Sequence, residues 1–427
     1  MPCSLGSFAQ AMHLLFIHQA FPAQFGRLAL ELTKRYGWQC SFVVHHLSRC
    51  PTPAAEMIER LQIIALPPDP KQAVLAPWPS SLANFLALCG TVHDVVRSRP
   101  DLRPDLVVSH CGLGPSLFLH EVLSCPFVHY FEYYLGRPHR DLTYRVDLPP
   151  VPFAPFYPRC INAGTLLGLV DVPRGYTPTH YQRQSFPERF RSRIEVHFDG
   201  IDTELYRLRR GQAASAQLTS LLGGRALPDG TRLVTFVARG LESMRGFDLF
   251  LRLAGRISRQ RPDVLFAVAG GDMSYYGWDQ QITGGISFKQ WAQARGDCDP
   301  ARLVFLGQVE PEQLAVVLAR SDLHVFLTVP FVLSWSLFNA LACGCVVLAA
   351  DVEPVREVIE PGVNGLVGAL FDIDQLTETA LRVLADPAIY RPLGQAARAR
   401  MEEHYSLEVA VPALKTYFER QARGEGG

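Results

Sequence analysis

LHVFLTVPFVLSWSLFNALACGCVVLAA, residues 323–350, is the stretch that decides the fold. It lies between Asp322 and Asp351 and contains no Asp, Glu, Lys or Arg. Its length would permit a membrane span, but Pro330, two serines and the Cys-Gly-Cys turn at 343–345 divide it. The pieces have the lengths of a strand, a helix and a second strand, so we predict a buried βαβ unit instead of a bilayer helix.

Similar apolar, β-branched runs recur along the whole chain, with helical segments between them. Strands of a parallel sheet that is buried on both faces have this character. The runs form two sets, which predicts an α/β protein with two doubly wound domains. The expected strands are 13–18, 40–44, 61–65, 106–109 and 127–130 in the first half, and 233–237, 265–269, 303–306, 324–327 and 346–349 in the second.

The regions between the strand sets are less regular. Turn residues and charges at 199–211 mark the expected join between the two domains. The stretch 135–175 is rich in Pro, Arg and Tyr, and we interpret it as an irregular insertion. Residues 1–11 lack the basic and apolar regions of a secretory signal, and we expect a short disordered extension there.

Composition narrows the classes of function. Lys plus Arg and Asp plus Glu both number 41, so the formal net charge is zero and no global basic field indicates nucleic acid as a partner. The ten cysteines include no C-x-x-C pair, so we expect reduced thiols in a cytoplasmic protein. The sequence contains no recognisable metal centre, P-loop or dinucleotide-binding Gly-rich turn.

Ligands of open parallel sheets bind beyond the carboxyl ends of the strands, so the segments after the strands matter most. In ARGLESMRG, residues 238–246, Arg239 lies at an expected strand end and Arg245 at the start of the next helix. Paired guanidiniums offer planar forks of donors that suit a diphosphate. Two ordinary surface arginines would also satisfy this pattern.

A second anion seat is expected where a helix begins near Ser334. Free backbone amides and the helix dipole favour a negative charge at that end. Ser334 also fits an ordinary helix N-cap, and a cap can coexist with an anion above it.

Beyond these patterns, the chain resembles the retaining glycosyltransferases of family 4, which have the GT-B fold. The resemblance covers about residues 12–420. It is clearest in ARGLESMRGFDLFL (238–251), GQVEPEQLAVVLARSDLHVFLTV (307–329) and PFVLSWSLFNALACGCVVLAADVEPVREVIEPGVNGLV (330–367).

The resemblance implies two Rossmann-like domains that face a central cleft. It implies metal-independent transfer, in which arginines and helix dipoles neutralise the leaving diphosphate. The implied division is an extension at 1–11, an acceptor-binding domain at 12–205, a nucleotide-sugar-binding domain at 206–400, and a C-terminal helix in 401–427 that crosses back to the first domain.

The resemblance also implies roles for residues of the second half. Arg239 and Arg245 occupy the positions that hold the donor diphosphate. The family's ribose-binding glutamate falls on Asn339, which can still donate and accept hydrogen bonds, and its partner glutamate falls on Phe331. With no carboxylate at Phe331, we expect backbone amides of the PFVLSWS loop to contact the sugar. We assign the ribose and sugar to Asn339 and to two residues of that loop, Leu333 and Trp335.

In the first half, HQAFPAQFG (18–26) resembles a mobile loop that approaches the donor diphosphate and the acceptor. Gly26 would let the backbone come close to the diphosphate, and Gln24 and Phe25 are assigned to the acceptor side. A simple strand-to-helix turn, with Phe21 and Phe25 packed inward, fits the loop equally well.

CPFVHYFEYYLG (125–136) resembles the strand end at which many family members carry a catalytic-site histidine, and alignment places Glu132 on that position. A carboxylate there could stabilise oxocarbenium charge or accept a hydrogen bond from a hydroxyl. Glu132 could instead pair with Arg137 or Arg140. His110 is the second catalytic candidate, with a satisfied polar group as its alternative.

These patterns together predict a glycosyltransferase. It would move a sugar from a nucleotide-diphosphate donor to a saccharide, lipid-linked or small-molecule acceptor with retention of configuration. The donor is a co-substrate, and no cofactor or metal is expected. Peripheral contact with the inner membrane face is compatible with this function. A same-fold sugar-nucleotide epimerase and a catalytically silent nucleotide-sugar-binding scaffold remain open as alternatives.

Overall fold

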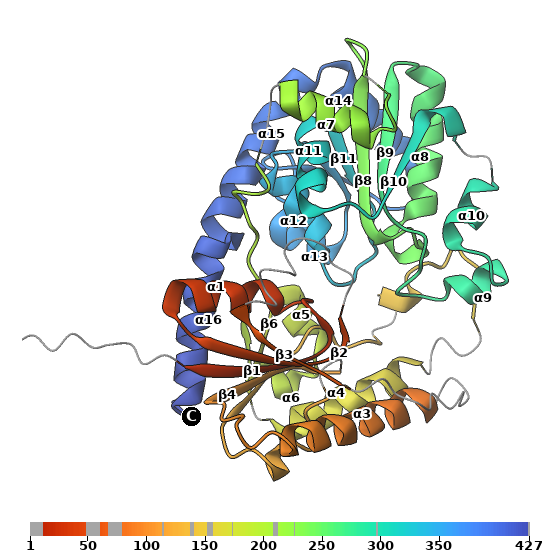
Figure 1. Ribbon diagram of the computed structural model, residues 1–427. Coiled ribbons are helices and arrows are strands. Elements are labelled where there is room, and N and C mark those ends of the chain that lie inside the picture. The colour runs from red at the N-terminus through yellow and green to blue at the C-terminus, as the bar shows by residue number, and fades with distance from the viewer. Residues whose placement is uncertain are drawn as a thin grey trace, which may run out of the picture.

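The computed structural model describes residues 12–47, 60–66, 79–112, 115–136, 141–151, 157–172, 174–207, 212–225, 227–295 and 298–425. Two parallel sheets form the centres of two lobes, one above the other in Figure 1. We call the part built on the sheet of residues 13–196 the first lobe, and the part built on the sheet of residues 232–368 the second lobe.

The first sheet has the strand order β3-β2-β1-β4-β5-β6-β7 and the second has the order β10-β9-β8-β11-β12-β13. Each order reverses direction once, beside β1 in the first sheet and beside β8 in the second, and ligands of such sheets bind near that point. The strands are β1 (His13–Phe21), β2 (Gln39–Leu47), β3 (Gln62–Ala65), β4 (Leu106–His110), β5 (Phe127–Tyr130), β6 (Gly175–Thr177), β7 (Ile194–Val196), β8 (Arg232–Gly240), β9 (Val264–Gly271), β10 (Leu303–Gly307), β11 (Leu323–Phe326), β12 (Val347–Ala350) and β13 (Leu366–Gly368).

Helices cover the faces of both sheets (Figure 1). In α8 the apolar residues recur at intervals of three and four, which buries one face while Arg252 and Arg259 stay exposed on the other. The helices are α1 (Gly26–Tyr36), α3 (Pro79–Arg97), α4 (Tyr157–Asp171), α5 (His180–Ser185), α6 (Glu188–Arg191), α7 (Gln212–Leu221), α8 (Phe247–Gln260), α9 (Asp279–Thr283), α10 (Phe288–Gln293), α11 (Pro311–Arg320), α12 (Trp335–Ala342), α13 (Glu353–Val358), α14 (Ile373–Ala385), α15 (Pro387–Arg400) and α16 (Leu407–Ala422).

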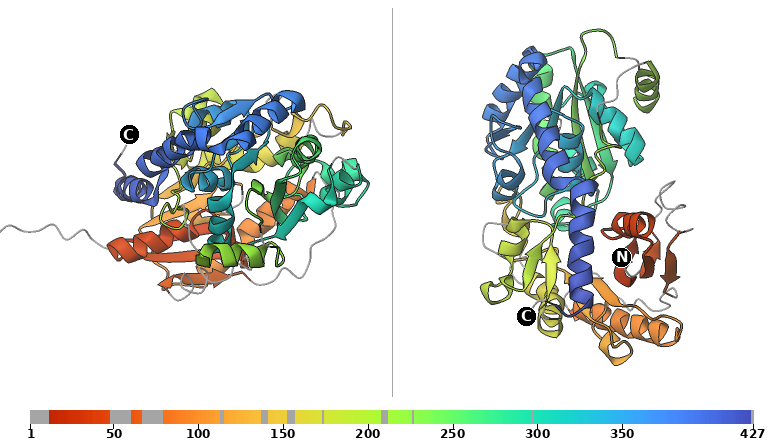
Figure 2. Two further views of the ribbon diagram at one scale, coloured as in Figure 1. Left: turned by 90° about the horizontal axis from the view of Figure 1, so that it is seen from above. Right: turned by 90° about the vertical axis from the view of Figure 1, so that its left-hand side faces the viewer.

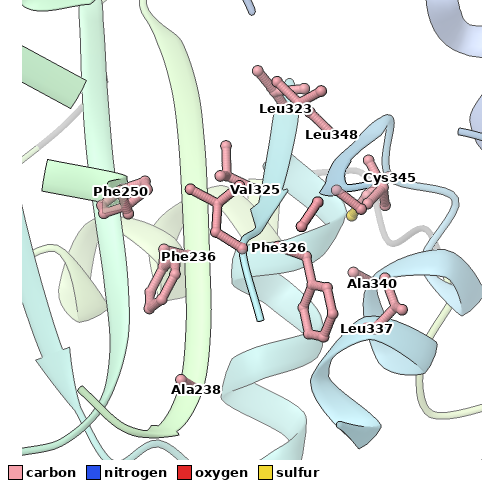
Figure 3. Close-up of a cluster of buried hydrophobic side chains, with 14 of the residues drawn as sticks. Phe236, Ala238, Phe250, Leu323, Val325, Phe326, Leu337, Ala340, Cys345 and Leu348 are labelled. Carbon is pink, nitrogen blue, oxygen red and sulfur yellow. The ribbon is translucent and has the colours of Figure 1, made fainter. Parts of the chain in front are cut away.

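The apolar stretch 323–350 forms the expected βαβ unit, which consists of β11, α12 and β12. Figure 3 shows Phe326 and Leu337 of this unit packed in one cluster with Phe236 of β8. These side chains are at most 3% exposed. The protein interior therefore provides the apolar surroundings that a membrane would otherwise provide. Within the described ranges, no helix is both long and apolar enough to cross a bilayer.

Two expectations about secondary structure are corrected. The short strands β6 and β7 were not predicted, nor was β13 in the second half, because three residues are too few to form a recognisable apolar run. The stretch 135–175 is not irregular throughout, since it contains the 15-residue helix α4. Glycines allow α4 to approach the sheet closely, because a Cβ at Gly168 would lie 2.7 Å from Sγ of Cys111.

The chain connects the two lobes twice, and the two connections lie side by side. Ile201 of the first connection donates to and accepts from the backbone beside Ser406 of the second, through Tyr405 O at 2.8 Å and Leu407 N at 2.9 Å. Helix α16 then returns to the first lobe, where its buried face joins the core of β1 and β4. Figure 2 shows this helix running along the first lobe.

Residues 141–148 belong to the first half of the chain but pack on the second lobe. The side chain of Arg145 is 6% exposed. It donates to the carbonyl of Ser243 at 2.6 Å and to both carboxylate oxygens of Asp248 at 3.0 and 2.7 Å. The backbone amide of Asp141 donates to the carbonyl of Pro330 at 3.0 Å. This segment therefore ties the two lobes together.

Arg145→Ala is expected to destabilise the protein by about 3–5 kcal/mol, because it leaves the buried carboxylate of Asp248 without its cation. Arg356→Ala is the matched control, since Arg356 also pairs with both carboxylate oxygens of one aspartate, Asp351, at 2.6 and 2.7 Å, but on the surface. Loss of that exposed pair should cost about 0–1 kcal/mol. Urea unfolding measures both changes, and equal losses would contradict the structural role of Arg145.

Candidate active site at the junction of the two lobes

The loop after β8 carries the predicted arginine pair to the junction. Arg245 is 7% exposed, and Arg239 is exposed. The guanidinium carbon of Arg239 lies 3.9 Å from the ring centroid of Tyr275, and that of Arg245 lies 5.5 Å from the ring of Tyr276. The two arginines thus lie over adjacent tyrosines, a cation–π arrangement that orients both guanidiniums.

Glu242 lies between the two arginines in the sequence and was not among the predicted site residues. Its side chain is 1% exposed and lies 3.6 Å from Nε of Arg245. The carboxylate accepts hydrogen bonds from the backbone amides of Tyr275 and Tyr276. Burial raises the pKa of Glu242 to about 7, against the opposing effects of Arg245 and the two amides. An acid between two arginines at a strand end is the signal that could have revealed this residue.

A second buried carboxylate, that of Asp279, also connects the loop after β8 to the segment 274–279. Asp279 accepts hydrogen bonds from the backbone amide of Ser243 at 3.0 Å, from the Ser243 hydroxyl, and from the Ser274 hydroxyl at 2.6 Å. Burial raises the pKa of Asp279 above its usual range. The loop after β8 and the segment 274–279 therefore form one cross-braced unit.

In the first lobe, the ends of β1, β4 and β5 bring three predicted residues together. Nε2 of His110 lies 3.5 Å from Oε2 of Glu132, and Nε2 of Gln24 donates to Oε1 of Glu132 at 3.2 Å. His18, which was not predicted as a site residue, lies perpendicular to His110 with 5.0 Å between ring centroids. Burial lowers the pKa of His18 to about 3, so its ring is neutral at pH 7.

The charge of Glu132 depends on both lobes. Burial would raise the pKa of its carboxyl, but the hydrogen bond and charge of His110, with a smaller effect of Arg245, outweigh burial and lower it. Glu132 is therefore ionised at neutral pH. The alternative partners Arg137 and Arg140 lie outside the described residues. The structure thus brings Gln24 and His110 to the carboxylate of Glu132, and the charge of Arg245 in the second lobe also lowers the pKa of that carboxyl.

Two predicted residues do not fit their assigned roles. Gly26 is buried, and its amide donates to the carbonyl of Pro22 at 2.7 Å, so it is not open to a diphosphate. Phe25 is 1% exposed and packs between Phe16 and Tyr130, with ring centroids 5.2 and 5.8 Å away, so it cannot meet an acceptor. These residues follow the alternative interpretation, a strand-to-helix turn with its aromatic rings packed inward.

The loop before α12 lies on the second-lobe side of the junction. Ser334 is the N-cap of α12, with its hydroxyl accepting from the Ser336 amide at 3.3 Å. Leu333 is partly buried against the second-lobe core. Asn339 lies one helical turn after Trp335, which places both on one face of α12, and Asn339 is 9% exposed while Trp335 is 42% exposed.

Phe331, at the position of the family's second glutamate, is part of an aromatic cluster that crosses the junction. Its ring lies 5.0 Å from the ring of Tyr133 and 5.0 Å from that of Tyr276. It is 5% exposed. Phe331 therefore supports the tyrosine under Arg245 through packing and offers no polar group to a ligand.

Asp199 joins the lobes beside this site. Its Oδ2 accepts from the hydroxyl of Tyr130 at 3.2 Å in the first lobe and from Nε1 of Trp335 at 3.3 Å in the second. Burial raises the pKa of Asp199 to about 7, against the lowering effect of these two hydrogen bonds.

Asp199→Asn should make stability less dependent on pH. The folded protein keeps the proton of Asp199 up to about pH 7, whereas an unfolded aspartate loses it near pH 3.9, so ionisation costs stability as the pH rises between these values. Asparagine cannot ionise and keeps an acceptor for both donors. From about pH 5 to pH 8 the variant should therefore gain about 1–3 kcal/mol relative to wild type. Denaturant unfolding at both pH values measures this, and a constant difference would contradict it.

Comparisons with known proteins agree with this geometry. Residues 73–206 match the Glycosyl transferase family 4 group, and residues 223–400 match Glycosyl transferases group 1. The D-inositol 3-phosphate glycosyltransferase of Mycolicibacterium smegmatis is 29% identical over 231 residues, which are 54% of this chain and 48% of that protein. The chain spans less than half the length of the curated relatives it matches, with 30%, 44% and 48% of three of them covered.

Solved structures cover nearly the whole chain. The sucrose-phosphate synthase of Thermosynechococcus elongatus has a TM-score of 0.74 and 16% identity over 97% of this chain and 100% of that one. HepE of Anabaena, in complex with UDP-glucose, has a TM-score of 0.71 and 15% identity over 96% and 99% of the two chains. At this identity the likeness shows the fold, and it confirms the two-lobed GT-B architecture. Because both halves also match family profiles, the chain belongs to the family 4 group of GT-B glycosyltransferases.

Proposed function

We propose that this protein is a metal-independent glycosyltransferase that moves a sugar from a nucleotide-diphosphate donor to a saccharide, lipid-linked or small-molecule acceptor with retention of configuration. One observation carries the proposal. The ring of Tyr133, the residue after Glu132 in the first lobe, and the ring of Tyr276, which lies under Arg245 in the second lobe, both pack on Phe331 at 5.0 Å, so a carboxylate and a guanidinium come from opposite lobes to one junction. Sugar transfer from a diphosphate is favoured by cations that stabilise the leaving phosphate, and an anion beside the sugar can stabilise the positive charge that develops there.

At the phosphate end, the two arginines are oriented but keep hydrogen-bonding capacity. Arg239 is exposed and stacks on Tyr275. Among the described residues, the polar contacts of the Arg245 guanidinium are long, 3.5 Å to the carbonyl of Val332 and 3.6 Å to the carboxylate of Glu242. Each guanidinium can therefore turn donors toward phosphate oxygens, and such charged hydrogen bonds are among the strongest in proteins. The start of α12 supplies backbone amides to the same anion.

At the sugar end, Glu132 is held in place by neighbours that keep it ionised. Gln24 and His110 contact its two oxygens, and Gln182 donates to its backbone carbonyl at 2.7 Å. The bond from the anomeric carbon to the diphosphate breaks, and its electron pair leaves with the diphosphate. A carboxylate beside that carbon stabilises the positive charge that develops before the acceptor oxygen forms the new bond and passes its proton to an oxygen of the leaving diphosphate.

The relatives indicate which donor to test first. The mycobacterial relative is named as a glycosyltransferase of D-inositol 3-phosphate, and the structure of HepE contains UDP-glucose. We therefore infer that a nucleotide-diphosphate sugar is the donor and choose UDP and UDP-glucose as probes.

Arg239→Ala and Arg245→Ala should each weaken UDP binding about 10- to 100-fold, because each removes charged hydrogen bonds worth about 1.5–3 kcal/mol. Arg259→Ala, an exposed arginine near the end of α8, is the control and should bind UDP like wild type. Isothermal titration calorimetry measures all three. Wild-type affinity in both of the first two variants would remove the arginine pair from the donor site.

Glu132→Gln should lower kcat for release of UDP from UDP-glucose by about 100-fold or more while UDP affinity changes little, because the lost charge acts mainly in the transition state. The melting temperature should stay near that of wild type, since glutamine can keep the contacts with Gln24 and His110. Unchanged turnover per folded molecule would exclude Glu132 from catalysis.

The same assay separates the two other functions. An epimerase would convert UDP-glucose into its epimer without releasing UDP, and a silent scaffold would bind UDP-glucose without consuming it. Either result in the wild-type protein, in the presence of mixtures of saccharide, lipid-linked and small-molecule acceptors, would contradict the proposed transferase.

A further inference from the structure

A cavity of about 280 Å³ lies where α4 of the first lobe meets residues 274–281 of the second. The two sides touch through an edge-to-face pair, Tyr157 and Trp278, with ring centroids 4.9 Å apart. The residues that determine its chemistry are Tyr157, Tyr275, Tyr276, Trp278, Gln280 and Gln281.

We propose that this cavity binds a neutral glycosyl unit of the acceptor. The inference rests on the proposed transferase function and specifies the class of its second substrate. It assigns residues 274–281 a role beyond the support that Tyr275 and Tyr276 give to the two arginines.

The lining suits a sugar ring better than an anion. It has four aromatic rings, two side-chain amides and one charged group, Asp279. The carboxylate of Asp279 already accepts hydrogen bonds from Ser243 and Ser274. Among the described residues that line the cavity, none is Lys, Arg or His, so the lining itself offers no cation to a phosphate. Aromatic faces can cover the C–H faces of a pyranose, while glutamine amides donate to and accept from its hydroxyls.

The cavity also has the right position relative to the donor site. Tyr275 and Tyr276 line the cavity and also carry Arg239 and Arg245 on their rings. A glycosyl unit bound there would lie next to the groups that hold the donor diphosphate, as an acceptor must.

The wall of the cavity that residues 274–281 form is held in place by buried hydrogen bonds within the second lobe. Glu242 fixes the backbone of both tyrosines, and Asp279 fixes the segment to Ser243. Gly277 turns the chain with a φ of 83°, a conformation that glycine adopts without strain. Preorganised walls reduce the entropic cost of binding. Because α4 forms the opposite wall, the cavity is complete only when both lobes are in contact.

Saturation-transfer NMR on the full chain tests the proposal, with maltose, cellobiose, lactose and chitobiose as probes and UDP titrated in the same samples. Tyr157→Ala, and separately the double variant Gln280→Ala/Gln281→Ala, should weaken binding of the disaccharide that wild type prefers by about tenfold or more, which corresponds to one lost stacking or paired-amide contact. UDP affinity should stay within about twofold of wild type. The glutamines are exposed, so their variant tests the cavity even if Tyr157→Ala folds poorly.

Phe371→Ala is the matched control. It removes a different aromatic pair between the two halves of the chain, Tyr144 and Phe371, whose ring centroids lie 5.8 Å apart outside the cavity. It should leave binding of both disaccharide and UDP at the wild-type level. Weakened sugar binding in this variant as well would mean that lobe contact in general, and not the cavity, recognises the sugar.

Three results would overturn the assignment. They are the absence of binding by all four disaccharides, unchanged sugar binding in both cavity variants, and selective loss of UDP affinity in those variants, which would give the cavity to the nucleobase. Failure of the wild-type protein to bind UDP would instead contradict the proposed function, and the sugar measurements would still decide the cavity.

Discussion

The rest of the site depends on the contacts that the buried carboxylate of Glu242 makes. It joins two loops that are about thirty residues apart in the sequence, by accepting from the amides of Tyr275 and Tyr276 and lying beside Arg245. The position of both tyrosine rings follows from it, and with them the orientation of the arginines and one wall of the cavity. Burial makes this carboxylate costly, as its raised pKa shows. Such a cost is typical of groups that maintain a functional arrangement.

The second constraint is the fixed relation between the lobes. A site that takes its anion from one lobe and its cation from the other works only if the lobes are held in register. Several polar contacts maintain that register. The carboxylate of Glu357 in α13 accepts from the amides of His180 and Tyr181 at the start of α5 at 2.7 and 2.8 Å, and the Tyr181 hydroxyl donates to the carbonyl of Pro330 at 3.1 Å. Together with the contacts of Arg145, they hold the two lobes in a fixed position relative to each other.

Errors in the sequence interpretation have specific physical causes. Helix α4 was missed because its Gly, Pro and Asn residues obscure the helical pattern, although Gly168 is what lets the helix lie against β4. Gly26 and Phe25 were assigned to ligands because they follow a strand end, but the tight turn directs both into the core. His18 belongs to the same loop and was passed over, since nothing local shows that its ring meets His110.

What the sequence determined by itself is local and periodic. Uniform apolar runs identified ten of the strands and the βαβ unit at 323–350, because burial of both sheet faces leaves a direct mark on composition. Strand-end position also predicted that Arg239 and Arg245 lie at the edge of the sheet where ligands bind, since parallel strands end at a common edge. Only the tertiary structure decided which groups face one another. The pairing of Glu132 with His110, the bracing of Tyr275 and Tyr276 by Glu242, and the cavity between α4 and residues 274–281 join segments far apart in the chain. Such contacts arise from how the two lobes fold and dock, and hydrophobic periodicity carries no information about that geometry.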